Sequence, residues 1–190
     1  MKVMSQSEAG QRLARGIALA ANKVPLVLAI THGGAAVGAE VAASLSAELD
    51  VLTVVRLEVP GRMHSTFGAV ADGAVVLLPD RVRELDLPSD YVDALTALAR
   101  GDVERITHAR RGREAAIPLA GRTVALVDDG SADVTLMMGA VTALRRGGVK
   151  RLIVASPEVG PELGDVLTQT ADDQVLLERV GAGTQVRDPS

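Results

Sequence analysis

Thr123-Val-Ala-Leu-Val-Asp-Asp-Gly-Ser-Ala-Asp-Val-Thr135 is the stretch of sequence that decides the fold. Its first five residues are apolar or β-favouring and predict a buried strand, and apolar residues then recur at helical spacing from Leu136 to Leu144. The stretch therefore predicts a strand, an acidic turn and a helix. In open α/β sheets, ligands bind beyond the carboxyl ends of strands, where helix N-termini present free N–H groups. The turn is thus the first candidate for a ligand site.

The composition predicts one domain with an aliphatic core. The chain has 190 residues, of which 47% are apolar, and it contains no cysteine, which excludes disulfides and thiolate chemistry. Its net charge of −4 argues against broad nucleic-acid binding but leaves room for a local basic patch. No apolar run approaches the ~18 residues of a membrane span, so we expect no membrane partner and a cytoplasmic location.

Strand and helix patterns alternate along the whole chain. This alternation predicts an α/β fold with a mostly parallel twisted sheet flanked by helices and an antiparallel hairpin excursion. Ser5 is expected to cap the first helix and Ser89 a long later one, with an Asp72-Gly73 hairpin turn between them. The other expected elements are strands at 26–30, 51–56, 152–155 and 174–177, helices at 37–47 and 162–170, and a buried stripe on the long helix made by Val92, Leu95, Leu98, Val103 and Ile106.

Three motifs in matching order resemble the type I phosphoribosyltransferases, and most closely a group of uncharacterised members. They are the Leu-Val-Asp-Asp-Gly run ending at Gly130, the Gly33-Gly34 turn followed by Ala-Glu-Val-Ala at 39–42, and Val-Pro-Gly at 59–61 followed by Phe-Gly-Ala-Val-Ala at 67–71. The similarity covers about residues 7–159. It implies one phosphoribosyltransferase-like domain over 1–190, with a lid and hairpin at 57–78 and a polar tail at 180–190.

The resemblance assigns the acidic pair to the sugar of phosphoribosyl pyrophosphate. Enzymes of this family displace pyrophosphate, usually with Mg²⁺, through an oxocarbenium-like transition state. Adjacent carboxylates such as Asp128 and Asp129 can accept both hydroxyls of a vicinal diol, or hold Mg²⁺ against the sugar. Their charge also favours the developing cation. Without the family pattern, one carboxylate would simply cap the helix and the other would be solvated.

The earlier turn is expected to bind the pyrophosphate. Gly33 and Gly34 allow a sharp bend that points backbone N–H groups at an anion, and Thr31 and His32 precede them. The family often carries arginine or lysine in this turn. Neutral His32 brings little positive charge near pH 7, so weaker and more pH-dependent pyrophosphate binding is expected, unless His32 is only a turn residue.

Basic residues follow the second expected strand. Arg56 takes the place of a lysine in the resembled group and is assigned a catalytic role, while Arg62, His64 and Ser65 fall in the lid. These groups would close over the leaving pyrophosphate and exclude water. The alternative is a surface ion pair for Arg56 and an ordinary exposed loop.

The loop expected to bind the sugar's 5′-phosphate departs from the family pattern. Where the family typically has Thr-Gly-x-Thr, this chain has Asp133, Val134, Thr135 and Leu136. A carboxylate about 4 Å from a phosphate repels it by ~4 kcal/mol at an effective dielectric near 20. We expect Asp133 to turn away and cap its helix, or a magnesium ion to bridge it to the phosphate. The expected phosphate-site residues are Gly130, Ser131, Ala132, Asp133, Val134 and Thr135.

The sequence leaves the function open between several classes. The leading hypothesis is a phosphoribosyltransferase with weak activity and an unidentified acceptor, since residues 180–186 offer no aromatic side chain to stack on a base. The second is a ligand-binding or regulatory protein that kept the fold and lost turnover. An exposed sheet edge or aliphatic helix face is where a homodimer would form. A third hypothesis, RNA binding, rests on basic residues near the end of the long helix: Arg105, His108, Arg110, Arg111 and Arg113.

Overall fold

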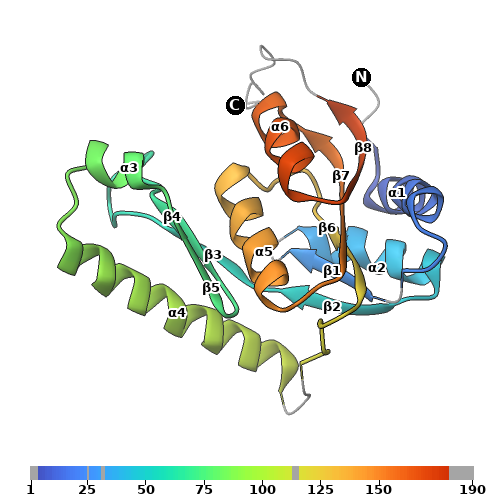
Figure 1. Ribbon diagram of the computed structural model, residues 1–190, viewed down its shortest axis with the longest axis horizontal. Coiled ribbons are helices and arrows are strands. Elements are labelled where there is room, and N and C mark those ends of the chain that lie inside the picture. The colour runs from blue at the N-terminus through green and yellow to red at the C-terminus, as the bar shows by residue number, and fades with distance from the viewer. Residues whose placement is uncertain (1–3, 25, 31–32, 113–115, 180–190) are drawn as a thin grey trace.

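The computed structural model describes residues 4–24, 26–30, 33–112 and 116–179 (Figure 1). Within these described ranges, no helix is both long enough and apolar enough to cross a membrane. Along the chain the elements are α1 (Gln6–Ala20), β1 (Leu26–Ile30), α2 (Gly34–Leu45), β2 (Glu48–Leu52), β3 (Val54–Leu57), β4 (Gly68–Ala71), β5 (Ala74–Leu77), α3 (Pro79–Glu84), α4 (Ser89–Arg111), β6 (Thr123–Val127), α5 (Val134–Arg146), β7 (Arg151–Val159), α6 (Pro161–Thr170) and β8 (Asp173–Arg179).

The main sheet has five parallel strands in the order β2-β1-β6-β7-β8. Helices α1 and α2 cover one face, and α5 and α6 cover the other (Figure 1). The predicted α/β class with a mostly parallel sheet is therefore confirmed. Because all strands run the same way, their carboxyl ends meet at one edge, where the acidic turn after β6 lies beside the start of α2.

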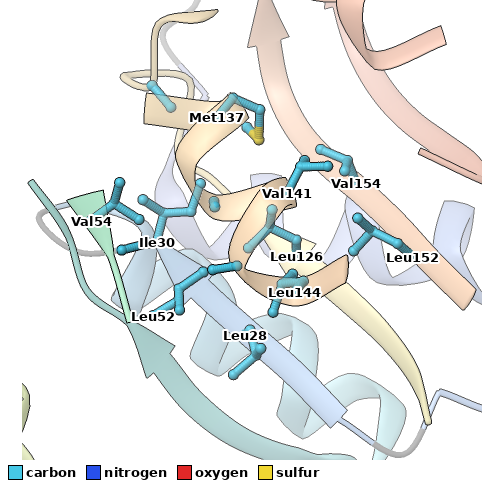
Figure 2. Packing of buried hydrophobic residues seen from close by; sticks show 14 of the residues in the cluster. Leu28, Ile30, Leu52, Val54, Leu126, Met137, Val141, Leu144, Leu152 and Val154 are labelled. Carbon is cyan, nitrogen blue, oxygen red and sulfur yellow. The ribbon is translucent and has the colours of Figure 1, made fainter. Parts of the chain in front are cut away.

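Alternate residues of the main-sheet strands point to opposite faces of the sheet and belong to two apolar layers, one on each face. In β1, Leu28 and Ile30 belong to the layer beneath α5, whereas Val27 belongs to the layer beneath α1 and α2. Met137 and Leu144 of α5 reach down onto the strands (Figure 2). The near-continuous apolar strand sequences are what a sheet buried on both faces requires.

The expected second strand at 51–56 is wrong as a single element. The chain crosses at Thr53 from β2 in the main sheet to β3 in a separate three-stranded antiparallel sheet of order β3-β4-β5. Thr53 is buried, and its hydroxyl lies 3.0 Å from the Thr107 hydroxyl of α4, which fixes the crossing point. The Asp72-Gly73 hairpin is confirmed between β4 and β5, with Gly73 at φ +70°.

Helix α4 covers the small sheet, and its predicted details are partly wrong. Pro88 rather than Ser89 occupies the N-cap position, and no side chain caps the helix. Val92 and Val103 are buried as expected, but Leu98 is 68% exposed. Six residues place Leu98 about 120° around the helix from Val92, outside the narrow stripe that a three-stranded sheet can cover. The short helix α3 was not predicted, although Pro79 at its first position and Asp80 in its first turn are typical of a helix start.

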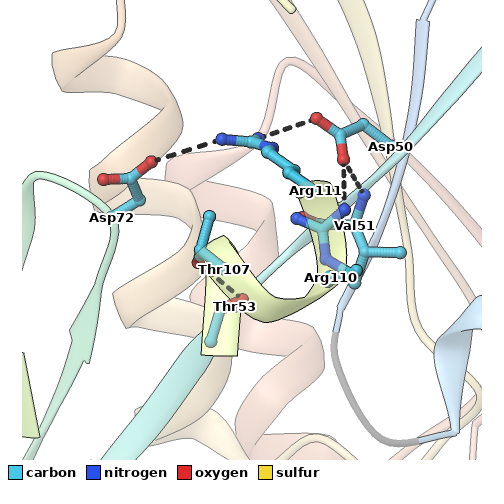
Figure 3. Close-up of polar contacts among 7 residues, drawn as sticks. All are labelled: Asp50, Val51, Thr53, Asp72, Thr107, Arg110 and Arg111. Atoms are coloured by element: carbon cyan, nitrogen blue, oxygen red, sulfur yellow. Dashed lines mark hydrogen bonds and ion pairs between the residues drawn. The ribbon is translucent and has the colours of Figure 1, made fainter. Parts of the chain in front are cut away.

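A cluster of charges joins the end of α4 to β2 (Figure 3). Asp50 accepts hydrogen bonds from Arg110 at 2.6 Å and from Arg111 at 2.7 Å, and its carboxylate is only 9% exposed. Burial pushes the pKa of Asp50 up, but the hydrogen bonds from Arg111, the Val51 N–H and Arg110 outweigh it and hold the pKa below its usual value. Two of the basic residues considered for RNA binding are thus paired within the fold.

We expect Asp50→Asn to destabilise the protein by about 2–3 kcal/mol at pH 7, because two guanidinium groups lose their shared charge. The lowered pKa means that the Asp50 carboxylate stabilises the fold above its unfolded pKa, near 3.9, and loses this effect as the pH falls through the lower folded value. Urea unfolding should therefore show the gap between variant and wild type closing below about pH 4. An equal gap at pH 7 and pH 3 would contradict this assignment.

Candidate functional site

Asp128 leaves the carboxyl end of β6 and turns into the protein. Its side chain is 2% exposed, and Oδ2 accepts hydrogen bonds from the Gly130 N–H at 2.7 Å and the Ala132 N–H at 3.3 Å. Burial raises the pKa of Asp128 above its ordinary value; the two backbone donors oppose this, and the neighbouring charge of Asp129 adds to it. The protein therefore carries a buried carboxylate whose ionisation is disfavoured.

Asp129 points to the opposite side of the turn, toward the start of α2. Its Oδ1 accepts a hydrogen bond from the Ser131 N–H at 3.1 Å. Its Oδ2 lies 1.5 Å from the position that a Cβ on Gly33 would take, so only glycine fits there without moving Asp129. Gly34 begins α2 and packs against the Val127 carbonyl of β6. The acidic pair and the glycine turn thus meet at one point of the sheet edge.

Asp133 caps α5, as expected from the sequence. Oδ1 accepts a hydrogen bond from the Leu136 N–H at 2.9 Å. Oδ2 accepts one from Arg56 Nε at 3.0 Å, in an ion pair whose two side chains are 37% and 47% exposed. The carboxylate therefore takes the position that an anionic ligand of this helix terminus would take, and it also engages a nearby cation.

A pocket of about 460 Å³ lies between this turn and the small sheet. Asp128, Ser131 and Ala132 form its floor on the side of the main sheet, while β3 and α4 form the opposite wall. This opposite wall is mainly aliphatic and also carries two arginines, Arg56 and Arg105, and two carboxylates, Glu58 and Asp102. The lining residues are Ile30, Val54, Val55, Arg56, Glu58, Asp102, Arg105, Ile106, Asp128, Ser131, Ala132 and Leu136.

The remaining predicted site residues are placed as follows. Val134 and Thr135 form the first turn of α5, next to the capping Asp133. Thr31 and His32 lie outside the described residues. The roles assigned to all of these positions stay predictions.

The lid residues are held against α3 rather than lining the pocket. Ser65 is buried, and its hydroxyl accepts a hydrogen bond from the Val59 N–H at 3.0 Å. Arg62 donates to the Leu85 carbonyl at 3.3 Å, and Arg81 of α3 donates to the His64 carbonyl at 2.7 Å. These contacts tie the segment into the small sheet's own core. Closure of Arg62 and His64 over pyrophosphate stays an untested expectation.

Sequence reasoning missed two contributors to the site. Ser156 is fully buried on β7, and its hydroxyl lies 3.3 Å from Asp128 Oδ2 and 2.9 Å from the Glu158 carbonyl. A polar residue directly after the apolar run at 152–155, on a strand adjacent to β6, was the available signal. Arg105 was considered only for RNA, yet it lines the pocket and pairs with Asp102 at 2.9 Å.

Comparisons with known proteins agree with this architecture. Two Mycobacterium tuberculosis proteins, from strains CDC 1551 / Oshkosh and ATCC 25618 / H37Rv, are each named "putative phosphoribosyl transferase" and are 38% identical to this chain over 177 residues. The match covers 90% of this chain but only 39% of those proteins, so the chain spans about two-fifths of their length. No family model matches the chain.

Solved structures place the fold. The protein TT1426 from Thermus thermophilus is 31% identical, with a TM-score of 0.79, and the match covers 98% of this chain and 88% of that one. A purine phosphoribosyltransferase from Pyrococcus horikoshii Ot3 is 12% identical, with a TM-score of 0.54, over 100% of this chain and 96% of that one. At that identity the likeness shows the fold alone. Taken together, these matches lead to one conclusion: the chain has the fold of the type I phosphoribosyltransferases and is similar in sequence to proteins named as phosphoribosyl transferases.

Proposed function

We propose that this chain binds phosphoribosyl pyrophosphate at the acidic turn, with the ribose between Asp129 and the start of α2, and transfers the phosphoribosyl group to an unidentified acceptor with release of pyrophosphate. The pocket that Asp128 lines lies next to this position, although Asp129 and Gly33 are not among its lining residues. The observation that supports this proposal most is the meeting of Asp129 with Gly33 at the sheet edge. A ribose held by the acidic pair would there lie beside the N-terminus of α2, where backbone N–H groups favour an anion.

The two carboxylates take different parts in this proposal. Asp129 is half-buried and has an oxygen directed away from its own turn, so it accepts the ribose hydroxyls. Asp128 is engaged by the Gly130 and Ala132 N–H groups, so it contributes mainly a fixed negative charge close to the anomeric carbon. Such a preorganised charge favours an oxocarbenium-like transition state over the neutral ground state.

The donor set fits a magnesium ion shared with the substrate. No group of three or more histidine, cysteine or acidic side chains among the described residues is placed to hold a metal ion, so the carboxylates offered to a cation at the turn would be those of Asp128 and Asp129. One or two carboxylates, completed by water and phosphate oxygens, is the ligand set that Mg²⁺ commonly takes. When bound, the ion would neutralise charge on the departing pyrophosphate.

Calorimetry with phosphoribosyl pyrophosphate and Mg²⁺, alongside an assay for pyrophosphate release, tests the proposal. We expect binding in the micromolar to millimolar range, and both binding and release should fall at least about tenfold in Asp129→Asn. Asp165→Asn on the exposed face of α6 is the matched control and should behave as wild type. If the wild type does not bind phosphoribosyl pyrophosphate at millimolar concentration, the proposed substrate is refuted.

Gly33→Ala tests the contact between the two turns. The backbone of Gly33 is right-handed helical (φ −99°, ψ −27°), so alanine fits the chain but pushes Asp129 out of its position. We expect the affinity for phosphoribosyl pyrophosphate to fall about tenfold or more, with little change in the melting temperature. Gly101→Ala is the control, since a Cβ there meets nothing within 4 Å; it should leave affinity unchanged and stabilise α4 by up to ~1 kcal/mol.

One observation favours a second candidate, a ligand-binding or regulatory protein without turnover. Asp133 caps α5 and pairs with Arg56, so the terminus expected to bind the 5′-phosphate already holds a carboxylate. The pyrophosphate assay separates the two candidates. If phosphoribosyl pyrophosphate binds but no pyrophosphate is released with any of a broad panel of amine and base acceptors, the regulatory protein is supported.

A further inference from the structure

A second pocket, of about 310 Å³, lies beneath the opposite end of α5. The candidate active site adjoins Leu136 at the start of this helix, whereas the second pocket adjoins Ala143, Arg146 and Gly147 near its end. Its other walls are the Asp72-Gly73 hairpin tip and Arg111 at the end of α4. Aliphatic side chains complete the lining: Leu28, Val51, Leu52, Ala116, Ile117 and Leu119.

Arg111 leaves one buried donor unused in this pocket. Its terminal nitrogens reach Asp50 at 2.7 Å and Asp72 at 3.9 Å (Figure 3), while its Nε is buried without a hydrogen-bond partner in the part of the chain that the structure describes. A buried N–H without an acceptor costs about as much free energy as a lost hydrogen bond.

One arginine at the pocket wall is left without a carboxylate partner among the described residues. Arg110 and Arg111 share Asp50, and the longer contact of Arg111 to Asp72 is the second ion pair of that side chain. Arg146 pairs with no carboxylate among the described residues; its nearest hydrogen-bond acceptor is the Gly73 carbonyl, at 3.4 Å. The pocket lining holds two arginines, Arg111 and Arg146, and two aspartates. Because Asp50 and Asp72 are both engaged by arginines of α4, Arg146 is the lining cation that has no carboxylate partner among the described residues.

We infer that this pocket binds a small organic monoanion, a carboxylate with an aliphatic body. The carboxylate would pair with Arg146, and the aliphatic body would lie on the apolar lining. One negative charge would pair with Arg146, and a volume near 300 Å³ is at the lower end of the range for small-molecule sites. This site is separate from the acidic turn, and its ligand need not be a substrate or product of the proposed transfer.

Hexanoate is the probe, with hexanol as the uncharged control and acetate as the control without an aliphatic body. Amide shifts of the ¹⁵N-labelled chain should report binding at about 1–10 mM hexanoate, with the largest changes at Gly73 and Gly147. Ser131 reports on the active-site pocket, and Thr170 on a shallow groove that Arg146 also borders, so these two amides should stay unmoved. Acetate and hexanol should each bind at least about tenfold more weakly.

Arg146→Gln should weaken hexanoate binding about tenfold, because it removes the unmatched cation from an exposed position that the fold does not need. Arg100→Gln on the exposed face of α4 makes the same change in net charge and should bind as wild type. Three results would each overturn the inference: no shifts up to about 50 mM hexanoate, equal binding of hexanol, or equal binding by Arg146→Gln.

Discussion

Asp128→Asn should lose phosphoribosyl transfer by about 10²–10³-fold and yet unfold at a higher urea concentration than the wild type at pH 7. The activity falls because the fixed charge beside the anomeric carbon is removed. The stability rises because burial disfavours the ionised form of this carboxyl relative to its neutral form. Asparagine keeps an oxygen for the Gly130 and Ala132 N–H groups and never ionises.

The pH dependence of this gain has a defined sign. The folded pKa of Asp128 is raised above its unfolded value, so wild-type stability falls as the pH rises from near 3.9 through the folded pKa. The advantage of Asp128→Asn should therefore be present at pH 7 and vanish near pH 3. Urea unfolding at both pH values measures it, with Asp165→Asn as the exposed control. A variant less stable than wild type at pH 7 would show that the buried charge is matched by its hydrogen bonds.

The β6 turn and α5 could be predicted because their signals are local. An apolar strand, two carboxylates and an apolar helical stripe follow one another without interruption, and an aspartate before a helix is a common N-cap. The capping role of Asp133 needed only the three residues to Leu136. Family likeness then brought the glycine turn at 33–34 to the same sheet edge, which the Asp129 contact now supports geometrically.

Contacts between distant residues could not be predicted from the same signals. Arg56 and Asp133 are 77 positions apart, and their pairing depends on how the small sheet lies against the main one. That arrangement follows from the crossing at Thr53, where no glycine or proline interrupts the mainly β-branched and apolar stretch at 51–57. A continuous β pattern states that residues are extended, but not which sheet they join. For the same reason the exposure of Leu98 was missed, since the width of the sheet under α4 decides it.

Asp133→Thr should raise the affinity for phosphoribosyl pyrophosphate by about 10–100-fold. The threonine hydroxyl can still cap α5, so the helix keeps its start with a change of less than ~1 kcal/mol. Two effects then favour the donor's 5′-phosphate: the carboxylate no longer repels it, and Arg56 loses its present partner. A charge-assisted bond from a released arginine is worth about 1.5–3 kcal/mol, which corresponds to the expected gain.

A double-mutant cycle separates these two effects. Arg56→Gln alone removes the cation but keeps the repulsive carboxylate, and Asp133→Thr with Arg56→Gln removes both. If Arg56 transfers from Asp133 to the phosphate, most of the gain from Asp133→Thr disappears in the Arg56→Gln background. If relief of repulsion dominates, the gain persists there and weakens as salt is added. Calorimetry of the four proteins with donor and Mg²⁺ gives the coupling energy directly. Unchanged affinity in Asp133→Thr itself would mean that the phosphate does not bind at the start of α5, and that the ion pair serves only to hold the small sheet against the acidic turn.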